Sequence, residues 1–358
     1  MAAKIRSRVR SPRITFVGVQ QTGSFMHRIR LSSLLAAITI ACAHSARQAP
    51  SNPEQVRPPI VDHHQHFFSE ALAALVNPNP APPGATVVES FGADSLIAML
   101  DSAGIQRALV LALGYSWGRP GRNVENEYEK VKAENDWVAA EVARYPDRLR
   151  AFCSFNPLRD YALTELARCA AHPQLRNGLK LHIGNARVDY HDARHLAQLR
   201  EVFRDVNARR MPIVIHMRAS ISAGFRYGRE EARIFFDSIL PAAPDIPVQI
   251  AHLAGAGGFD ATADSALSVF VEAIARKDPR ASNLWFDVTT VDRGVSPAGA
   301  QLIATRIRQL GIDRVLWGSD AATGGNLPPA KAWAEFRKIP LTAAEFQTIA
   351  TNVAPYLQ

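Results

Sequence analysis

The chain has 358 residues, of which 47% are hydrophobic and 21% charged, the composition of an ordinary globular protein. Its formal net charge is +8, but residues 1–43 hold seven basic and no acidic side chains, so the remainder carries 34 basic and 33 acidic residues, a net charge of about +1. Without a general excess of basic residues, nucleic acid is excluded as the expected partner.

Residues 1–43 have the three parts of a secretory signal. A basic start at 26–30 precedes an apolar run at 31–40, and Ala41-Cys42-Ala43 supplies the small residues of a cleavage site. The apolar run is too short to cross a bilayer, so no stable membrane span is expected. Cys42 also resembles the lipid-anchored cysteine of a bacterial lipoprotein. The leader therefore predicts export, to the periplasm or as an outer-membrane lipoprotein, with Met26 as an alternative start. A disordered basic arm with a chance apolar run is the competing interpretation.

A polar, proline-rich linker is predicted at 44–59 and one large domain at 60–358. Beyond the leader the only cysteines are Cys153, in an apolar strand-like run, and Cys169, in a helical one. We expect two separate buried thiols, and a disulfide between them is the alternative.

From residue 60 onward, short runs rich in β-branched residues alternate with longer segments of helical period. The predicted strands are 60–66, 107–113, 150–155, 178–183, 212–217, 248–253, 284–291 and 314–318. The predicted helices are 94–102, 125–144, 162–171, 193–209, 230–239, 265–276, 297–309 and a last helical stretch after Pro328. Eight strand–helix pairs predict an α/β protein with a closed (β/α)8 TIM barrel, because an open doubly wound sheet would be expected to have a glycine-rich turn after its first strand.

The longest predicted loops follow strands, at 67–93, 114–123 and 219–228. Loops at the carboxyl ends of barrel strands bind the substrate in this fold, so these loops lie on the expected face.

Polar residues end five of the predicted strands. The first strand ends in Asp62-His63-His64-Gln65-His66, and strict alternation would place Asp62, His64 and His66 on one face, where two imidazoles can clamp Zn²⁺ or a similar ion. The other four strand ends supply Lys180 with His182, then His216, His252 and Asp320. Buried polar groups without partners are costly, so five such ends at one barrel mouth predict a metal site.

The order H-x-H, Lys, His, His and Asp on strands one, four, five, six and eight resembles the amidohydrolase superfamily. The segments 60–66, 248–255 and 315–320 are most similar to its amidohydrolase-related branch, often called amidohydrolase 2. The resemblance implies His64, His66 and Asp320 as ligands of a first metal and His216 as a ligand of a first or second metal. His252 would bind a second metal or polarise the substrate. Lys180 matches a lysine that some members carboxylate to bridge two ions, and its alternative role is to anchor a substrate carboxylate.

The implied activity is that of a metal-dependent hydrolase acting on an amide, lactone or ester carbonyl of a small molecule. Asp320 would handle the proton of the attacking water, so Asp320 and His252 are the predicted catalytic residues. The expected cofactor is one or two divalent ions per chain, Zn²⁺ or alternatively Mn²⁺. The alternatives are a metal-dependent non-oxidative decarboxylase and a binding protein that has lost catalysis. His182 and Arg218 are predicted to contact the substrate, with a structural ion pair as the alternative for Arg218. A homodimer is also an expectation from the resemblance.

Overall fold

The computed structural model describes residues 56–77, 87–218, 226–323 and 325–358. The predicted leader, including Cys42, and most of the predicted linker lie outside these ranges, as do parts of two predicted loops at 78–86 and 219–225. No helix within the described ranges combines the length and the hydrophobicity that a membrane crossing requires.

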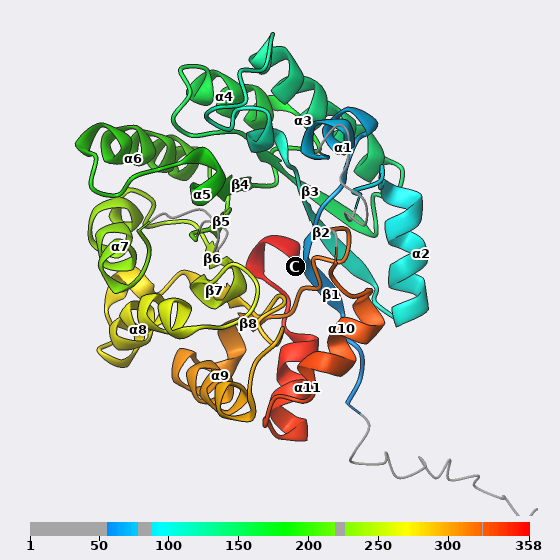
Figure 1. The fold of residues 1–358 in the computed structure, drawn as a ribbon, viewed down its shortest axis with the longest axis vertical. Coiled ribbons are helices and arrows are strands. Elements are labelled where there is room, and N and C mark those ends of the chain that lie inside the picture. Colours follow the sequence, from blue (N-terminus) through cyan, green and yellow to red (C-terminus); the bar gives the residue numbers. More distant parts are fainter. Residues whose placement is uncertain (1–55, 78–86, 219–225, 324) are drawn as a thin grey trace, which may run out of the picture. The chain divides into compact units, whose positions relative to one another are not determined.

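Eight parallel strands follow one another in chain order around a barrel (Figure 1). They are β1(Val61–Gln65), β2(Arg107–Leu111), β3(Leu149–Ser154), β4(Leu179–His182), β5(Ile213–His216), β6(Val248–Ile250), β7(Leu284–Asp287) and β8(Val315–Leu316). Two backbone hydrogen bonds join β8 back toward β1, from His63 N to Trp317 O at 3.0 Å and from Asp320 N to His64 O at 2.8 Å. The predicted (β/α)8 fold is confirmed.

Helices surround the ring of strands on its outer side (Figure 1). They are α2(Ala93–Ala103), α3(Glu127–Ala143), α4(Ala162–Ala171), α6(Ala193–Ala208), α7(Arg229–Ile234) with a π-helical turn at Phe235–Ile239, α8(Ala261–Ala275), α9(Pro297–Leu310), α10(Pro329–Phe336) and α11(Ala343–Thr351). Two short helices, α1(Glu70–Val76) and α5(Ile183–Ala186), lie in segments that were not predicted to be helical. Both follow strands, so they belong to the side of the barrel where substrate is expected.

Capping residues determine where several helices begin. The Asp260 side chain accepts from Ala263 N at the start of α8, and Ser296 accepts from Gly299 N before Pro297 opens α9. At α11, Thr342 and Glu345 form a reciprocal capping box. These side chains satisfy backbone N–H groups that the first helical turn leaves without partners.

The strands are buried on both faces, as expected for a parallel sheet covered by helices. The larger apolar cluster lies between strands and helices, and a second one, which includes Val61, Phe152 and Val214, fills the barrel interior. Cys153 and Cys169 are both buried and free, as predicted.

The last residues of the chain close the barrel at the amino ends of the strands. The C-terminus lies in the centre of the ring in Figure 1. Leu357 belongs to the interior cluster, and its carbonyl accepts from Arg107 Nη1 at 2.7 Å, at the first residue of β2. The Tyr356 ring lies 5.3 Å from that of Phe152, and its hydroxyl donates to Gln249 Oε1. This C-terminal plug, residues 353–357, is therefore part of the barrel core.

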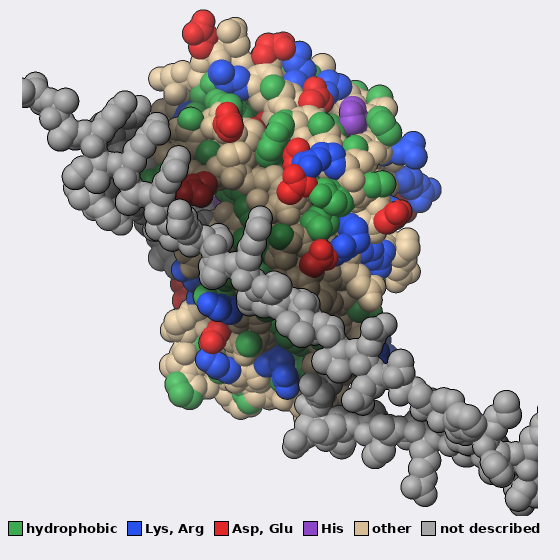
Figure 2. Space-filling model, turned by 90° about the vertical axis from the view of Figure 1, so that its right-hand side faces the viewer, with side chains coloured by type: hydrophobic (Ala, Val, Ile, Leu, Met, Phe, Trp, Pro, Cys, Tyr) green, Lys and Arg blue, Asp and Glu red, His purple; other side chains and the backbone are tan. Residues whose placement is uncertain are grey.

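Side chains of both signs are interspersed on the face of the barrel shown in Figure 2, over the part that the described residues form. Ion pairs such as Arg306–Asp264 and Arg308–Glu345 connect neighbouring elements around the outside of the barrel.

Deleting residues 355–358 should lower the free energy of unfolding by about 2–5 kcal/mol, because it uncovers the interior cluster and removes the donor to Gln249. Urea denaturation followed by circular dichroism measures the change. Deleting the exposed Gln358 alone is the matched control and should change stability by less than about 0.5 kcal/mol. Equal stability of the two truncated proteins would show that the plug does not support the barrel.

Candidate functional site

The polar residues predicted from five strand ends meet at the carboxyl end of the barrel. His64, His252 and Asp320 each offer one ligand atom, and these three atoms lie within 4.8 Å of one another. His66 Nε2 lies 3.6 Å from Asp320 Oδ1, and the His216 and His252 ring centroids are 4.7 Å apart. The structure thus assembles one cluster from β1, β5 and the segments after β6 and β8.

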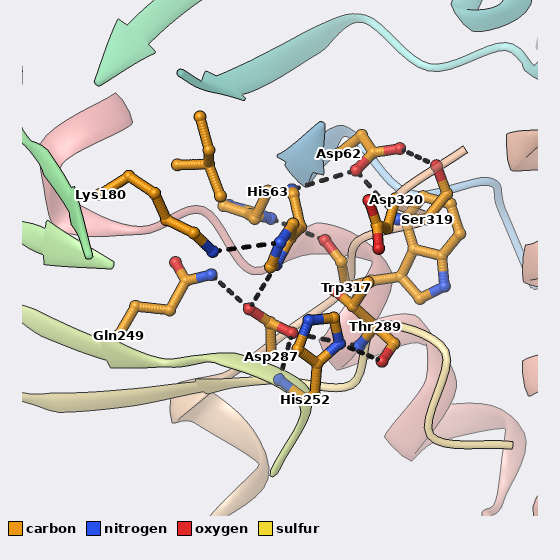
Figure 3. A network of polar contacts seen from close by, with 12 residues as sticks. Asp62, His63, Lys180, Gln249, His252, Asp287, Thr289, Trp317, Ser319 and Asp320 are labelled. Atoms are coloured by element: carbon orange, nitrogen blue, oxygen red, sulfur yellow. Dashed lines mark hydrogen bonds and ion pairs between the residues drawn. The ribbon is translucent and has the colours of Figure 1, made fainter. Parts of the chain in front are cut away.

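The strict alternation predicted for β1 does not hold. The register of β1 against β2 shifts between Asp62 and Gln65. Asp62 accepts a hydrogen bond from Gln65 Nε2 at 2.7 Å. It accepts another from Ser319 Oγ at 2.6 Å (Figure 3). Burial raises the pKa of Asp62 to about 6, against the opposing effect of these hydrogen bonds. Asp62 therefore supports the ends of β1 and β8 and takes no place among the metal-binding candidates.

Three histidines of the cluster are held by their Nδ1 atoms. His64 Nδ1 lies 3.2 Å from Asp287 Oδ2, His66 Nδ1 lies 2.6 Å from Leu111 O, and His252 Nδ1 lies 2.9 Å from Thr289 O. Carboxylate and carbonyl oxygens accept hydrogen bonds, which assigns the proton to Nδ1 and leaves Nε2 with a free lone pair. Burial, and after it the charge of Lys180, lowers the pKa of His64 and His66 to about 3. Neutral imidazoles anchored in this way are the form that binds metal ions.

His216 supplies an independent test of whether the residues fit a metal ion. The side chain is buried, and its Nε2 has no hydrogen-bond partner among the described residues. A buried nitrogen of this kind normally has a partner, and a divalent ion provides one. Imidazole nitrogens and a carboxylate are ligands that suit Zn²⁺ or Mn²⁺. The residues present therefore fit the expected ion.

Asp287, at the end of β7, is a residue of the site that the sequence analysis did not identify. Its buried carboxylate accepts hydrogen bonds from His64, from Gln249 Nε2 at 2.6 Å and from the backbone N–H of His252 at 2.9 Å (Figure 3). Burial alone would raise the pKa of Asp287, but the interactions with His64 and His252 hold that pKa below its ordinary value. The signal in the sequence was the same as at the other strands, a polar residue closing an apolar run.

Lys180 lies beside the cluster with its side chain completely buried. Its Nζ is 3.4 Å from His64 Nε2, and no carboxylate in the described part of the chain forms an ion pair with it. An ammonium group without an ion-pair partner is costly to bury, and burial lowers the pKa of Lys180 to about 8, against the opposing effect of the charges of Asp287 and Asp320. The position next to His64 is compatible with both roles predicted for this lysine.

The two residues predicted to contact substrate differ in their surroundings. His182 lines the cavity and stacks on His216, with ring centroids 4.0 Å apart. Its Nδ1 accepts from the backbone N–H of Asn185 at 3.2 Å, so the neutral ring carries its proton on Nε2. Arg218 instead donates to Asp260 at 2.7 Å and does not line the cavity. The structure favours the ion-pair alternative for Arg218 over contact with substrate.

A cavity of about 340 Å³ opens over the cluster, a size that suits a small molecule. His66, His182, His216, His252 and Asp320 all line it. The loops after β2 and β7 supply further walls of this cavity, which include Tyr115, Arg119, Arg122 and Arg293.

Two of the cluster residues have unusual backbone conformations. His252 and Asp320 have φ values of 54° and 52°, in the left-handed region, where a residue with a side chain is strained by about 1–2 kcal/mol. Gly318, two residues before Asp320, packs so closely against β1 that an added Cβ would lie 2.6 Å from the Cβ of His64. Such strain at adjoining positions is typical of functional sites.

Comparisons with known proteins agree with this geometry. A family model described as amidohydrolase matches residues 61–352. No curated protein matches the chain. The barrel is similar to 5-carboxyvanillate decarboxylase of Sphingomonas paucimobilis, with a TM-score of 0.57, 18% identity, and coverage of 83% of this chain and 97% of that one.

Two further solved structures show the same fold. A probable 2-pyrone-4,6-dicarboxylic acid hydrolase from Acinetobacter baumannii, with citric acid bound, has a TM-score of 0.54 and 17% identity, covering 81% of this chain and 95% of that one. A dihydroxybenzoic acid decarboxylase from Polaromonas sp., with bound manganese, has a TM-score of 0.56 and 16% identity, covering 84% of this chain and 96% of that one. Both hydrolases and decarboxylases are therefore built on this barrel.

Asp287→Asn should lower the affinity for Zn²⁺ about 10- to 100-fold, because the amide cannot accept from His64, Gln249 and His252 together. Competition with a fluorescent zinc chelator measures the affinity, and thermal unfolding of the metal-free protein shows whether the fold persists. The exposed Asp313→Asn is the matched control. An unchanged affinity in the Asp287 variant would remove this carboxylate from the support of the metal site.

Proposed function

The chain belongs to the amidohydrolase family, and on that premise we propose that it is a metal-dependent hydrolase that cleaves an amide, lactone or ester with water. The observation that carries the proposal is the orientation of the histidines. Oxygen atoms of Asp287, Leu111 and Thr289 accept hydrogen bonds from Nδ1 of three histidines, namely His64, His66 and His252. Nε2 of each ring is therefore free to act as a ligand.

His64, His66, His216 and Asp320 would hold the first ion, with His252 and Lys180 available to a second. A divalent ion bound there supplies a Lewis acid that polarises a carbonyl and makes hydroxide available near neutral pH. Asp320 is the proton carrier, because its carboxylate can take a proton from the attacking water and deliver it to the leaving group. The hydroxyl of Thr323 donates to Asp320 Oδ1 at 2.5 Å and fixes the orientation of that carboxylate.

His252 and His182 present different hydrogen-bonding groups to the cavity. Because Nδ1 of His252 faces Thr289 O, the neutral form of this ring would carry its proton there and offer a lone pair at Nε2, so it can serve as a ligand or base. With Nδ1 accepting from Asn185, neutral His182 offers an Nε2–H donor and binds a substrate oxygen. Of the two roles predicted for His252, metal binding is thus favoured over polarising the substrate.

A non-oxidative decarboxylase is the alternative function. Lys180 carries the observation that favours it, because an unmodified lysine beside His64 would place a cationic group where a substrate carboxylate could bind. A carboxylated Lys180 would instead bridge two ions and favour the hydrolase. Export of the protein is part of the proposal and rests on the sequence of the leader.

Metal content distinguishes these two forms of the site. The mature protein, grown with added Zn²⁺ and Mn²⁺, should hold two equivalents of metal by elemental analysis, and Lys180→Ala should hold one or none. The exposed Lys331→Ala is the matched control and should hold two. One equivalent that is unchanged by Lys180→Ala would assign Lys180 to substrate binding and raise the decarboxylase to equal standing. A protein that binds no metal would overturn the mechanism.

A panel of lactones, esters and amides should yield at least one substrate for the metal-loaded protein, and chelation should abolish the activity. Asp320→Asn should lower kcat/KM for that substrate about 10²- to 10⁴-fold, the usual contribution of a positioned proton carrier. Proton release in a weakly buffered assay reports hydrolysis. Release of CO₂ from carboxylated substrates, without hydrolysis of any member of the panel, would instead establish the decarboxylase.

A further inference from the structure

Two guanidinium groups line the wall of the cavity without a carboxylate partner among the described residues. Arg119 and Arg122 lie in the loop after β2 and line the same cavity as His252 and Asp320. Both are half-buried. Within the described ranges, the Arg119 guanidinium has no hydrogen bond or ion pair, and the Arg122 guanidinium donates only to the carbonyl of Ser116 at 3.0 Å.

Several other partly buried arginines of the barrel are paired with carboxylates, whereas Arg107, Arg200 and Arg314 donate to backbone carbonyls. Arg159 lies 2.8 Å from Glu127, Arg168 lies 2.8 Å from Glu165, and Arg306 lies 2.6 Å from Asp264. Each of these side chains is at most 35% exposed, so burial of the guanidinium is accompanied by a counter-charge. Within the described ranges Arg119 has neither kind of partner and Arg122 has a single carbonyl, at the place where a ligand would supply a counter-charge.

The charge balance of the cavity also favours an anion. Its described lining contains three arginines, namely Arg119, Arg122 and Arg293. Asp320 is the one acidic residue in that described lining. That carboxylate already belongs to the metal-binding cluster, and a bound divalent ion would add further positive charge. A concave site lined by one sign of charge concentrates ligands of the opposite sign.

We propose that Arg119 and Arg122 form a carboxylate-binding subsite, so that the substrate carries a second carboxylate apart from the group that reacts. A planar guanidinium offers paired N–H donors that match the two oxygens of a carboxylate. The substrate class is then small dicarboxylic acids and their lactones, monoesters or monoamides. This inference rests on the proposed function, because that function places the reacting group beside His252 and Asp320.

Direct binding to the metal-loaded protein tests the subsite without turnover. Isothermal titration would compare glutarate and isophthalate with their monoamides, glutaramate and 3-carbamoylbenzoate, which keep the shape and lose one charge. Wild type should bind at least one diacid about 10-fold or more tightly than its monoamide, as expected for charge-assisted hydrogen bonds. The Arg119→Gln/Arg122→Gln double variant should lose this preference and keep its monoamide affinity within about 3-fold.

Three controls keep the test decisive. Arg119→Gln alone removes a side chain without described partners, so it reports on the subsite even where the double variant unfolds. Arg119→Lys keeps the charge but loses the paired donors, so it should retain only part of the preference. Arg204→Gln removes an exposed charge from α6, away from the cavity lining, and should keep the full preference.

Absence of a diacid preference in wild type, or its survival in both Gln variants, would overturn the subsite. Tighter binding of 4-phosphonobutyrate than of glutarate, by about 10-fold or more, would reassign the subsite to a phosphate-like dianion. Failure of the subsite is distinguishable from failure of the proposed function. A protein that holds metal and hydrolyses uncharged esters without a diacid preference keeps the function and loses the subsite, whereas a protein without metal or hydrolysis loses the function.

Discussion

One buried carboxylate, that of Asp287, holds together the groups on which the candidate metal site depends. It accepts hydrogen bonds from the His64 ring, from the Gln249 side chain and from the backbone N–H of His252. These donors come from β1, β6 and the segment after β6, so one residue of β7 fixes the relative positions of three segments. Because an ionised carboxylate is acceptor-only and each donor needs an acceptor, the arrangement is satisfied only while Asp287 is charged. Its network extends through Gln249 to Tyr356, which connects the metal-binding face to the opposite end of the barrel.

The same segment after β6 shows how the barrel tolerates strain at its functional face. His252, Leu253 and Ala254 all have positive φ values, and Asp320 does as well. Each such residue costs about 1–2 kcal/mol, which surrounding hydrogen bonds must offset. The Asp287 carboxylate accepts a hydrogen bond from the backbone N–H of His252, and the His64 carbonyl accepts one from the backbone N–H of Asp320 at 2.8 Å. The backbone is thus bent toward the cavity at two residues whose side chains carry the proposed chemistry.

The sequence predicted the barrel because its strands are short apolar runs with a strong β-branched content, separated by segments of clear helical period. It also predicted the residues that the structure brings together in the candidate metal site, since a polar side chain at the end of an apolar run stands out. The irregularity of β1 was not predictable, because it depends on hydrogen bonds between Asp62 and Ser319, which are far apart in the chain. The pairing of Arg218 with Asp260 is likewise a tertiary contact between loops. Nor did the sequence distinguish Arg119 and Arg122 from solvated loop residues, since only the folded cavity shows that no carboxylate in the described part of the chain pairs with them.

The position of the C-terminal plug has a consequence for the order of events during synthesis. The ribosome makes the chain from its N-terminus, so residues 353–357 are synthesised after all eight strands. Until they emerge, Gln249 lacks the Tyr356 hydroxyl and the interior cluster lacks Leu357. The contacts that these residues make in the barrel core can therefore form only after every strand has been made.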